Sequence, residues 1–288
     1  MSEEMKSETK KILVVLAHPD DESFGMGGTL ALYARQGVDV RLVCATRGEV
    51  GEVDPEFKET IKSAACLRTQ ELQCAVKALG LSELIFLNYR DSGMPGSEDN
   101  HHPRALAAQP VEKVAAEVAH LIRKINPQVV LTFDPIGGYR HPDHIAIQQA
   151  TVQAFDLAAS ADFVDPESLP PFQADALYFH TMNKTYLKIA VAVMRLIGQN
   201  PREFGRNKDI DLVSLTEVEF PIHARINYRS VRAARDAAAA CHASQGGAQM
   251  NKGVRGLIGR LFGGYSDTFM QAYPVPVVGQ KVKRDLFE

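Results

Sequence analysis

The chain has 288 residues, of which 45% are hydrophobic, and its formal net charge is −3. A chain of this size can bury one large α/β core. Its slightly acidic balance, without a lysine- or arginine-rich block, gives no reason to expect a nucleic-acid partner. No apolar run is long enough to span a membrane, and the charged, polar stretch 1–11 does not resemble a signal peptide. We therefore expect a cytoplasmic protein.

Predicted strands alternate with predicted helices through the first half of the chain. Short apolar runs predict buried strands at 12–17, 38–45, 84–87 and 129–133. Apolar residues at helical spacing, bounded by glycine or proline, predict helices at 29–36, 57–79, 111–125 and 145–159. This alternation predicts an α/β fold, a Rossmann-like and mostly parallel sheet with helices on both faces.

The character of the sequence changes after about residue 160, where prolines become frequent. The elements predicted there are a strand at 176–180 and helices at 187–197 and 230–242. The glycine-rich segment 246–264 indicates loops, and its sequence assigns them no role. We expect residues 1–160 to form a catalytic half with both polar motifs described below. Residues 161–288 should form a smaller α+β layer that completes a substrate cleft, within a single domain. The sequence is compatible with a homo-oligomer and fixes no number of subunits.

Four cysteines, Cys44, Cys66, Cys74 and Cys241, show no CxxC spacing. Buried cysteines in a reducing compartment usually remain free thiols. We therefore expect four free thiols with no part in the chemistry.

The first polar motif follows the predicted strand 12–17 directly and contains His18, Asp20 and Asp21. In open α/β sheets, ligands bind at the carboxyl ends of the strands. Because Asp20 and Asp21 are neighbours, their side chains point in different directions. One is therefore expected to bind a metal ion and the other to handle a proton. An aspartate at a helix start can also act as a simple N-cap, and a second histidine cluster downstream favours the metal site.

That second cluster follows the strand 129–133 and contains Tyr139, His141, Asp143 and His144. If the two strands are neighbours, both motifs face the same edge of the sheet. His18, Asp21 and His144 then form a set of two histidines and one carboxylate. Such a set suits catalytic Zn²⁺ and equally Fe²⁺ or another divalent metal.

The two motifs, His18-Pro19-Asp20-Asp21-Glu22 and His141-Pro142-Asp143-His144, resemble those of the PIG-L/LmbE-type zinc-dependent deacetylases. This family includes the N-acetylglucosaminyl deacetylases of mycothiol, bacillithiol and GPI-anchor synthesis. Weaker similarities are a T-x-G-E loop at 46–49, an R-x-x-E helix at 68–71 and an H-x-S-Q segment at 242–245. The chain departs from the family at 267–269, where Asp-Thr-Phe stands in place of the common E-x-F.

The resemblance implies that His18, Asp21 and His144 hold the metal and that Asp20 is the general base. A bound cation lowers the pKa of a water molecule, and Asp20 then takes its proton. His141 is the expected hydrogen-bond donor to the oxyanion.

Asp143 is expected to keep His141 protonated and oriented, or to cap the helix, or both. Tyr139 is either a second donor to the carbonyl oxygen or a lid.

Four further side chains are candidates for substrate binding: Arg68, Glu49, Asp91 and His242. The first three are expected to hydrogen-bond sugar hydroxyls at the mouth of the site. His242 either reaches the cleft or lies at the end of its alanine-rich helix, where a cation is favoured. For Arg68 the alternative is an exposed helix arginine, although neither Ala64 nor Leu72 offers it an acid.

The expected partner is a small N-acetylated sugar. Alternatives are an amidase of thiol conjugates in the same family, or a non-catalytic protein that binds a metal or a sugar. The glycines at 25–28 also suit a nucleotide-binding oxidoreductase, but Leu30 stands where the third glycine of that fingerprint belongs.

Overall fold

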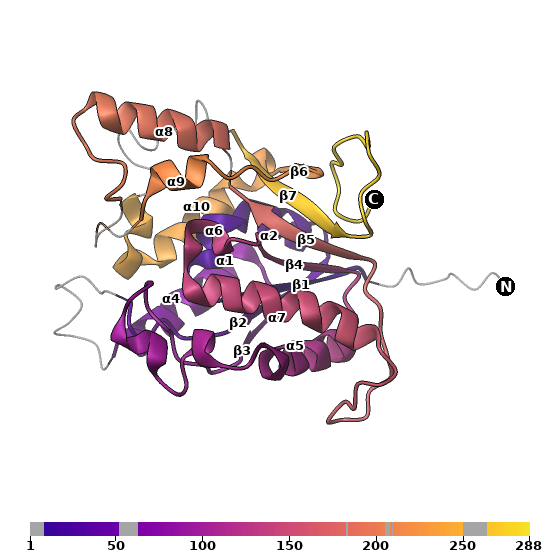
Figure 1. Ribbon diagram of the computed structural model, residues 1–288. Coiled ribbons are helices and arrows are strands. Elements are labelled where there is room, and N and C mark those ends of the chain that lie inside the picture. The colour runs from indigo at the N-terminus through magenta and orange to yellow at the C-terminus, as the bar shows by residue number, and fades with distance from the viewer. Residues whose placement is uncertain (1–8, 52–62, 183, 205–207, 209, 250–263) are drawn as a thin grey trace.

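The computed structural model describes residues 9–51, 63–182, 184–204, 208, 210–249 and 264–288. Its centre is a seven-stranded sheet with the strand order β3-β2-β1-β4-β5-β7-β6 (Figure 1). The strands are β1 (Lys11–Leu16), β2 (Asp39–Cys44), β3 (Glu83–Phe86), β4 (Val129–Phe133), β5 (Ala176–Thr181), β6 (Ala224–Asn227) and β7 (Ser266–Tyr273).

The first five strands are parallel, and β1 lies between β2 and β4. β1 is buried along almost its whole length, as its continuous apolar run predicts. The sheet grows in one direction from β1 to β3 and in the other from β4 onward, so the strand order reverses between β1 and β4. Ligands of such sheets bind at this reversal. The predicted α/β fold is confirmed.

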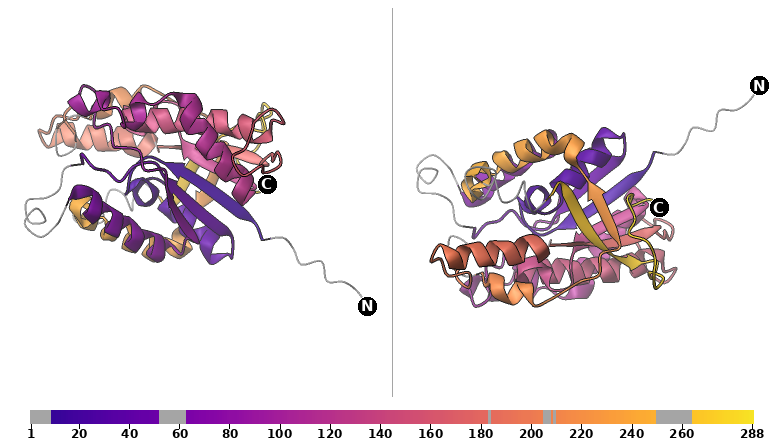
Figure 2. Two further views of the ribbon diagram at one scale, coloured as in Figure 1. Left: turned by 90° about the horizontal axis from the view of Figure 1, so that it is seen from below. Right: turned by 90° about the horizontal axis from the view of Figure 1, so that it is seen from above.

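Helices form a layer on each face of the sheet, as the two views in Figure 2 show. On one face lie α2 (Gly27–Arg35), α4 (Ala64–Leu79) and α10 (Arg232–Cys241), and on the other lie α5 (Val111–Ile125) and α7 (Pro142–Ala159). The Ser63 side chain caps the start of α4, and Gly80, with φ of 76°, ends it. The predicted residues 57–62 of this helix lie outside the described residues.

The C-terminal part of the chain extends the same sheet, because β7 pairs antiparallel with both β5 and β6. Neither β6 nor β7 was expected from the sequence. β6 has only four residues, and β7 buries polar side chains such as Thr268 and Gln271, which hides its apolar pattern.

The remaining α-helices are α1 (Asp21–Gly25), α6 (Gly137–Arg140), α8 (Lys184–Leu196) and α9 (Leu212–Thr216). The helices α8 and α9 form a separate small apolar cluster that also contacts Ile136 and Tyr139. None of the helices in the described ranges is long and apolar enough to cross a membrane.

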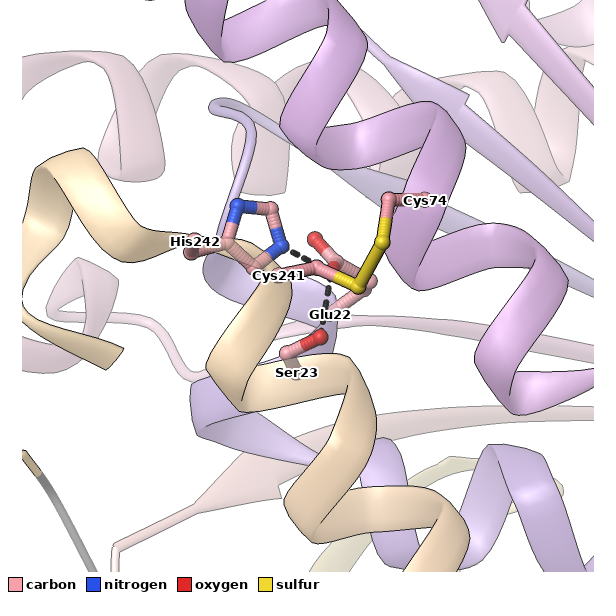
Figure 3. Close-up of a disulfide and its surroundings, with 5 residues drawn as sticks. All are labelled: Glu22, Ser23, Cys74, Cys241 and His242. Atoms are coloured by element: carbon pink, nitrogen blue, oxygen red, sulfur yellow. Dashed lines mark hydrogen bonds and ion pairs between the residues drawn. A yellow bond between two sulfur atoms is a disulfide. The ribbon is translucent and has the colours of Figure 1, made fainter. Parts of the chain in front are cut away.

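The prediction of four free thiols is wrong for two of the cysteines. Cys74 on α4 and Cys241 at the end of α10 form a disulfide (Figure 3), while Cys44 and Cys66 are free. The two bonded residues are 167 positions apart in sequence. Only the packing of α10 against α4 brings them together, and no local spacing signals it.

Breaking this disulfide should destabilise the fold. Cross-links of this kind typically contribute about 2–4 kcal/mol, largely by restricting the unfolded chain. We expect Cys74→Ser to lower the free energy of unfolding by about that amount in urea titrations without reductant. Cys66→Ser, at an exposed free thiol, is the matched control and should leave it unchanged. Equal stability of the two variants would contradict the expectation.

Asp267 on β7, where the family's glutamate is common, is buried and accepts hydrogen bonds from Thr29. The donors are the Thr29 backbone N–H (2.9 Å) and hydroxyl (2.7 Å), near the start of α2. Burial raises the pKa of Asp267 to about 6, against the lowering effect of those hydrogen bonds. The folded state therefore binds this proton more tightly than the unfolded state does.

The stability contribution of Asp267 should consequently depend on pH. It is fully present below the unfolded pKa of 3.8 and is lost as pH rises through about 6. Asp267→Asn keeps an acceptor for Thr29 and removes the titration. We expect the free energy of unfolding of this variant, relative to that of the wild type, to rise by about 2–3 kcal/mol from pH 4 to pH 8. Urea unfolding of both proteins at the two pH values measures this difference. A difference independent of pH would refute this account.

Candidate active site

The loop after β1 and the start of α7 bring three potential metal ligands together. His18 Nδ1 lies 3.1 Å from His144 Nε2, His144 Nε2 lies 3.2 Å from an oxygen of Asp21, and His18 Nδ1 lies 3.6 Å from its other oxygen. Ligands bound about 2.0–2.1 Å from a tetrahedral ion are about 3.3–3.4 Å apart. The two imidazole nitrogens and the two oxygens of Asp21 therefore have separations close to those of ligands around a single cation.

The other nitrogen of each imidazole has a hydrogen-bond acceptor of its own. His18 Nε2 donates to Asp143 (3.0 Å), and His144 Nδ1 donates to the carbonyl oxygen of Gly137 (3.2 Å). These bonds leave the lone pairs of His18 Nδ1 and His144 Nε2 facing each other. Such lone pairs repel unless a proton or a cation lies between them. Acceptors behind metal-bound histidines fix the ring tautomer in this way.

The charges around His18, Asp21 and His144 favour a positive charge between these side chains. Burial disfavours a charged His18, yet Asp91, Asp143 and Asp21 together raise its pKa well above the usual value. Burial likewise opposes a charged Asp21, yet His144 and His18 hold its pKa below the usual value. The donor set and its charge thus fit a divalent cation.

Two groups of three described residues offer one donor atom each with all three atoms within 4.8 Å of one another, and neither group includes Asp21. They are His18, His141 and His144, and His18, Asp91 and Asp143. In the second group Asp91 and Asp143 both face Nε2 of His18, which already donates to Asp143. The set of His18, Asp21 and His144 is favoured because the distances from the two imidazoles to each other and to the two Asp21 oxygens lie close to tetrahedral ligand spacing.

Asp20 lies beside this set in a strained backbone conformation, with φ of 119° and ψ of −26°. Its carboxylate accepts a hydrogen bond from Arg68 Nη2 at 3.1 Å. Burial raises the pKa of Asp20 to about 6, against the lowering effect of Arg68. A carboxyl with this pKa is ionised at neutral pH and is still basic enough to take up a proton.

The geometry contradicts the prediction that Asp143 keeps His141 protonated. The backbone N–H of Asp143 donates to His141 Nδ1 at 3.1 Å, so His141 caps α7. The Asp143 carboxylate points away and is held by Ser92 and the backbone N–H of Ala107, as well as by His18. Burial, and then the nearby His18 and His144, lower the pKa of His141. His141 is therefore neutral, with its proton on Nε2.

Tyr139 is half-buried and adjoins the same cluster. Its ring centroid lies 4.9 Å from that of His144 and 5.9 Å from that of His141, both edge-on. Burial raises the pKa of Tyr139, which keeps its hydroxyl protonated. The hydroxyl is thus available as a hydrogen-bond donor.

Three of the predicted substrate-binding residues, Arg68, Asp91 and Glu49, lie together, but Arg68 and Asp91 are buried and not at an exposed mouth. Arg68 is only 4% exposed and contacts Asp20 and the carbonyl oxygen of Pro19. Asp91 is 3% exposed and lies 3.4 Å from His18 Nε2. Half-buried Glu49 accepts the Asp91 backbone N–H at 3.0 Å. The burial of Arg68 and Asp91 places them behind the reacting groups.

His242 is completely buried beyond the end of α10, where its Nε2 lies 2.7 Å from Glu22. Glu71 was not predicted as a site residue. Its carboxylate accepts hydrogen bonds from the backbone N–H and the hydroxyl of Ser244 at 2.7 Å each. Ser92 was missed as well, as a donor to Asp143. The R-x-x-E similarity at 68–71 and the H-x-S-Q similarity at 242–245 could have indicated the contact between Glu71 and Ser244, because they contain these two residues.

Residues 13–155 match the model of the PIG-L family, described as GlcNAc-PI de-N-acetylase. A 1D-myo-inositol 2-acetamido-2-deoxy-alpha-D-glucopyranoside deacetylase of Streptomyces avermitilis is 36% identical over 245 residues, which cover 82% of this chain and 83% of that relative. The enzyme of the same name from Kineococcus radiotolerans is 44% identical over 190 residues, 61% of this chain, and the match spans 53% of the relative.

Solved structures share the fold at lower identity. An N,N'-diacetylchitobiose deacetylase from Pyrococcus horikoshii has a TM-score of 0.63 and 20% identity, covering 92% of this chain and 84% of its own. A 4-carboxy-2-hydroxymuconate hydratase from Pseudomonas putida has a TM-score of 0.62 and 19% identity, covering 95% of this chain and 100% of its own. The fold therefore serves more than one reaction, and the assignment depends on the closer sequence relatives. By its identity to them across most of both chains, this chain belongs to the PIG-L family and is a deacetylase, a hydrolase of N-acetyl amides.

Proposed function

We propose that this enzyme removes the acetyl group from an N-acetylglucosamine-type sugar conjugate, with Zn²⁺ held by His18, Asp21 and His144. The carrying observation is the spacing of 3.1 to 3.6 Å among the imidazole nitrogens of His18 and His144 and the two carboxylate oxygens of Asp21. The names of the curated relatives favour an N-acetylglucosaminyl inositol as the first substrate to test. We expect the enzyme in the cytoplasm, where Fe²⁺ is an alternative metal.

When bound, the cation supplies a Lewis acid for the amide carbonyl and makes a nearby water molecule more acidic. Asp20 receives the proton of the attacking water on its carboxylate, whose orientation Arg68 fixes from one side. A pKa of about 6 lets Asp20 pass that proton on to the nitrogen of the leaving amine.

We assign stabilisation of the oxyanion to His141 and Tyr139. Because His141 Nδ1 accepts a hydrogen bond from Asp143, Nε2 carries the ring proton and is the donor. A neutral imidazole is sufficient, since an oxyanion needs a placed N–H more than it needs a full charge. Glu49 is the best remaining candidate for contact with a sugar hydroxyl, and we assign Arg68, Asp91 and His242 supporting roles.

A panel of N-acetylated substrates tests the proposal directly. Acetate release is measured from N-acetylglucosaminyl inositol, free N-acetylglucosamine and a thiol-conjugate amide, with and without chelator. We expect release from a sugar conjugate, its loss on chelation and its return with zinc. Faster cleavage of the thiol conjugate would favour the amidase alternative. Metal or sugar binding without any acetate release would indicate a non-catalytic binding protein and refute the proposal.

A further inference from the structure

The backbone of Asp20 has a conformation that a non-glycine residue rarely adopts. Its φ of 119° lies far outside the regions favoured by side chains with a Cβ atom. Such a conformation persists only when its surroundings impose it, and strain of this kind concentrates at functional sites. The contacts that hold the peptide of Asp20 therefore control where its carboxylate points.

Glu22 supplies one of these contacts. Its Oε2 accepts the backbone N–H of Asp20 at 3.1 Å, and its Oε1 accepts the hydroxyl of Ser23 at 2.5 Å. Glu22 is 1% exposed. A carboxylate so deeply buried is costly unless a hydrogen-bonding partner compensates it.

His242 is that partner, and Figure 3 shows its ring pointing at the Glu22 carboxylate. The Nε2···Oε1 distance is 2.7 Å. The other ring nitrogen, Nδ1, is buried and has no hydrogen-bond partner among the described residues. The hydrogen bond to Glu22 is therefore what orients this imidazole, with edge-on contact from Phe24.

The disulfide connects the segment that carries His242 to α4, which carries the other residue that holds Asp20. Cys241 precedes His242 directly, and its partner Cys74 lies on α4, the helix that carries Arg68. Arg68 binds the Asp20 carboxylate, while Glu22 binds the Asp20 backbone. The disulfide thus links α4, which carries Arg68, to the residue beside His242, whose imidazole holds Glu22.

We propose that Glu22 and His242 are positioning residues, which hold the strained backbone of Asp20 so that its carboxylate meets the reacting water. This inference rests on the proposed function, in which Asp20 is the general base. The two residues hydrogen-bond to each other, and Glu22 also binds Asp20 and Ser23. They act through the hydrogen bond from the Asp20 N–H to Glu22.

The first test replaces His242 by alanine and by glutamine. Loss of the partner lets Glu22 and the Asp20 peptide relax, and a displacement of about 1 Å costs about 100-fold in rate. We expect His242→Ala to lower kcat by about 10- to 100-fold, with KM and bound zinc unchanged. The glutamine amide can still donate to Glu22, so His242→Gln should recover most of kcat. If His242→Ala does not fold, Glu22→Ala takes its place with the same expected loss, because it removes the acceptor for the Asp20 N–H directly.

A second test asks whether the effect passes through Asp20. In an Asp20→Asn background, the residual rate no longer depends on the base. His242→Ala should then cause no further loss, so the two changes should be strongly non-additive. A merely structural role would lower the residual rate by the same factor in both backgrounds.

Ser244→Ala is the matched control, because Ser244 is also buried and also ties the end of α10 to α4. Its hydroxyl binds Glu71, with no contact to Asp20. This variant should keep kcat within about twofold of the wild type, since the positioning hydrogen bonds remain. An equal loss of kcat in Ser244→Ala and His242→Ala, or additive losses with Asp20→Asn, would overturn the inference. Wild-type protein that releases no acetate would instead refute the proposed function itself.

Discussion

Replacement of Asp20 by asparagine is expected to lower kcat by about 10²- to 10⁴-fold, the range typical of a lost general base. Asparagine keeps the size of the side chain and an oxygen that can accept the hydrogen bond from Arg68. It cannot take up a proton. Because Asp20 is not one of the three proposed metal ligands, bound zinc and KM should stay near wild-type values. The measurement is initial-rate acetate release together with metal analysis of the purified variant.

The matched control is Asp99→Asn, a partly exposed aspartate whose partner is Arg90. It should leave kcat unchanged, because a surface ion pair of this kind contributes little and lies outside the site. If Asp20→Asn released acetate at the wild-type rate with zinc bound, another group would have to be the base. If it lost zinc, Asp20 would be acting as a ligand instead.

The parts of the fold that local patterns encode were predictable from the sequence. The apolar run before His18 identifies β1, and helical spacing gives the bounds of α5 as the structure has them. The prediction that both motifs reach one edge needed only that β1 and β4 be neighbours, which the sheet confirms. Strand ends and turn residues carry such information because they depend on a few adjacent residues.

Features that depend on distant packing were not predictable in this way. Arg68 was expected to hydrogen-bond a sugar hydroxyl at the mouth of the site, a role that the lack of an acidic helical neighbour favoured. The structure instead buries it against Asp20, which lies 48 residues earlier. The Cys74–Cys241 disulfide depends on the packing of α10 against α4. The orientation of Asp143 was misjudged because its backbone, rather than its carboxylate, contacts His141. The first two errors concern contacts that only the assembled fold creates. The third is local, but the Asp143 carboxylate is drawn away from His141 by the distant residues Ser92 and Ala107.

Replacement of His144 by alanine should abolish both metal binding and acetate release. Without this imidazole only two of the three closely spaced donors remain, which is too few for a tight catalytic zinc site. We expect purified His144→Ala to contain little zinc and to release acetate at a rate below detection, because the chemistry that the cation supplies is lost. Excess zinc should not restore the rate.

A thermal readout distinguishes loss of the ligand from loss of the fold. An ion that binds only the folded state raises the stability of the wild type as its concentration rises. The melting temperature of wild type should therefore increase with added zinc, whereas that of His144→Ala should not respond. His120→Ala is the matched control, since His120 pairs with Asp165 away from the site and should keep both zinc and activity. A folded His144→Ala protein with full zinc content would show that the ion lies elsewhere, and the three donor atoms would then need another explanation for their close approach.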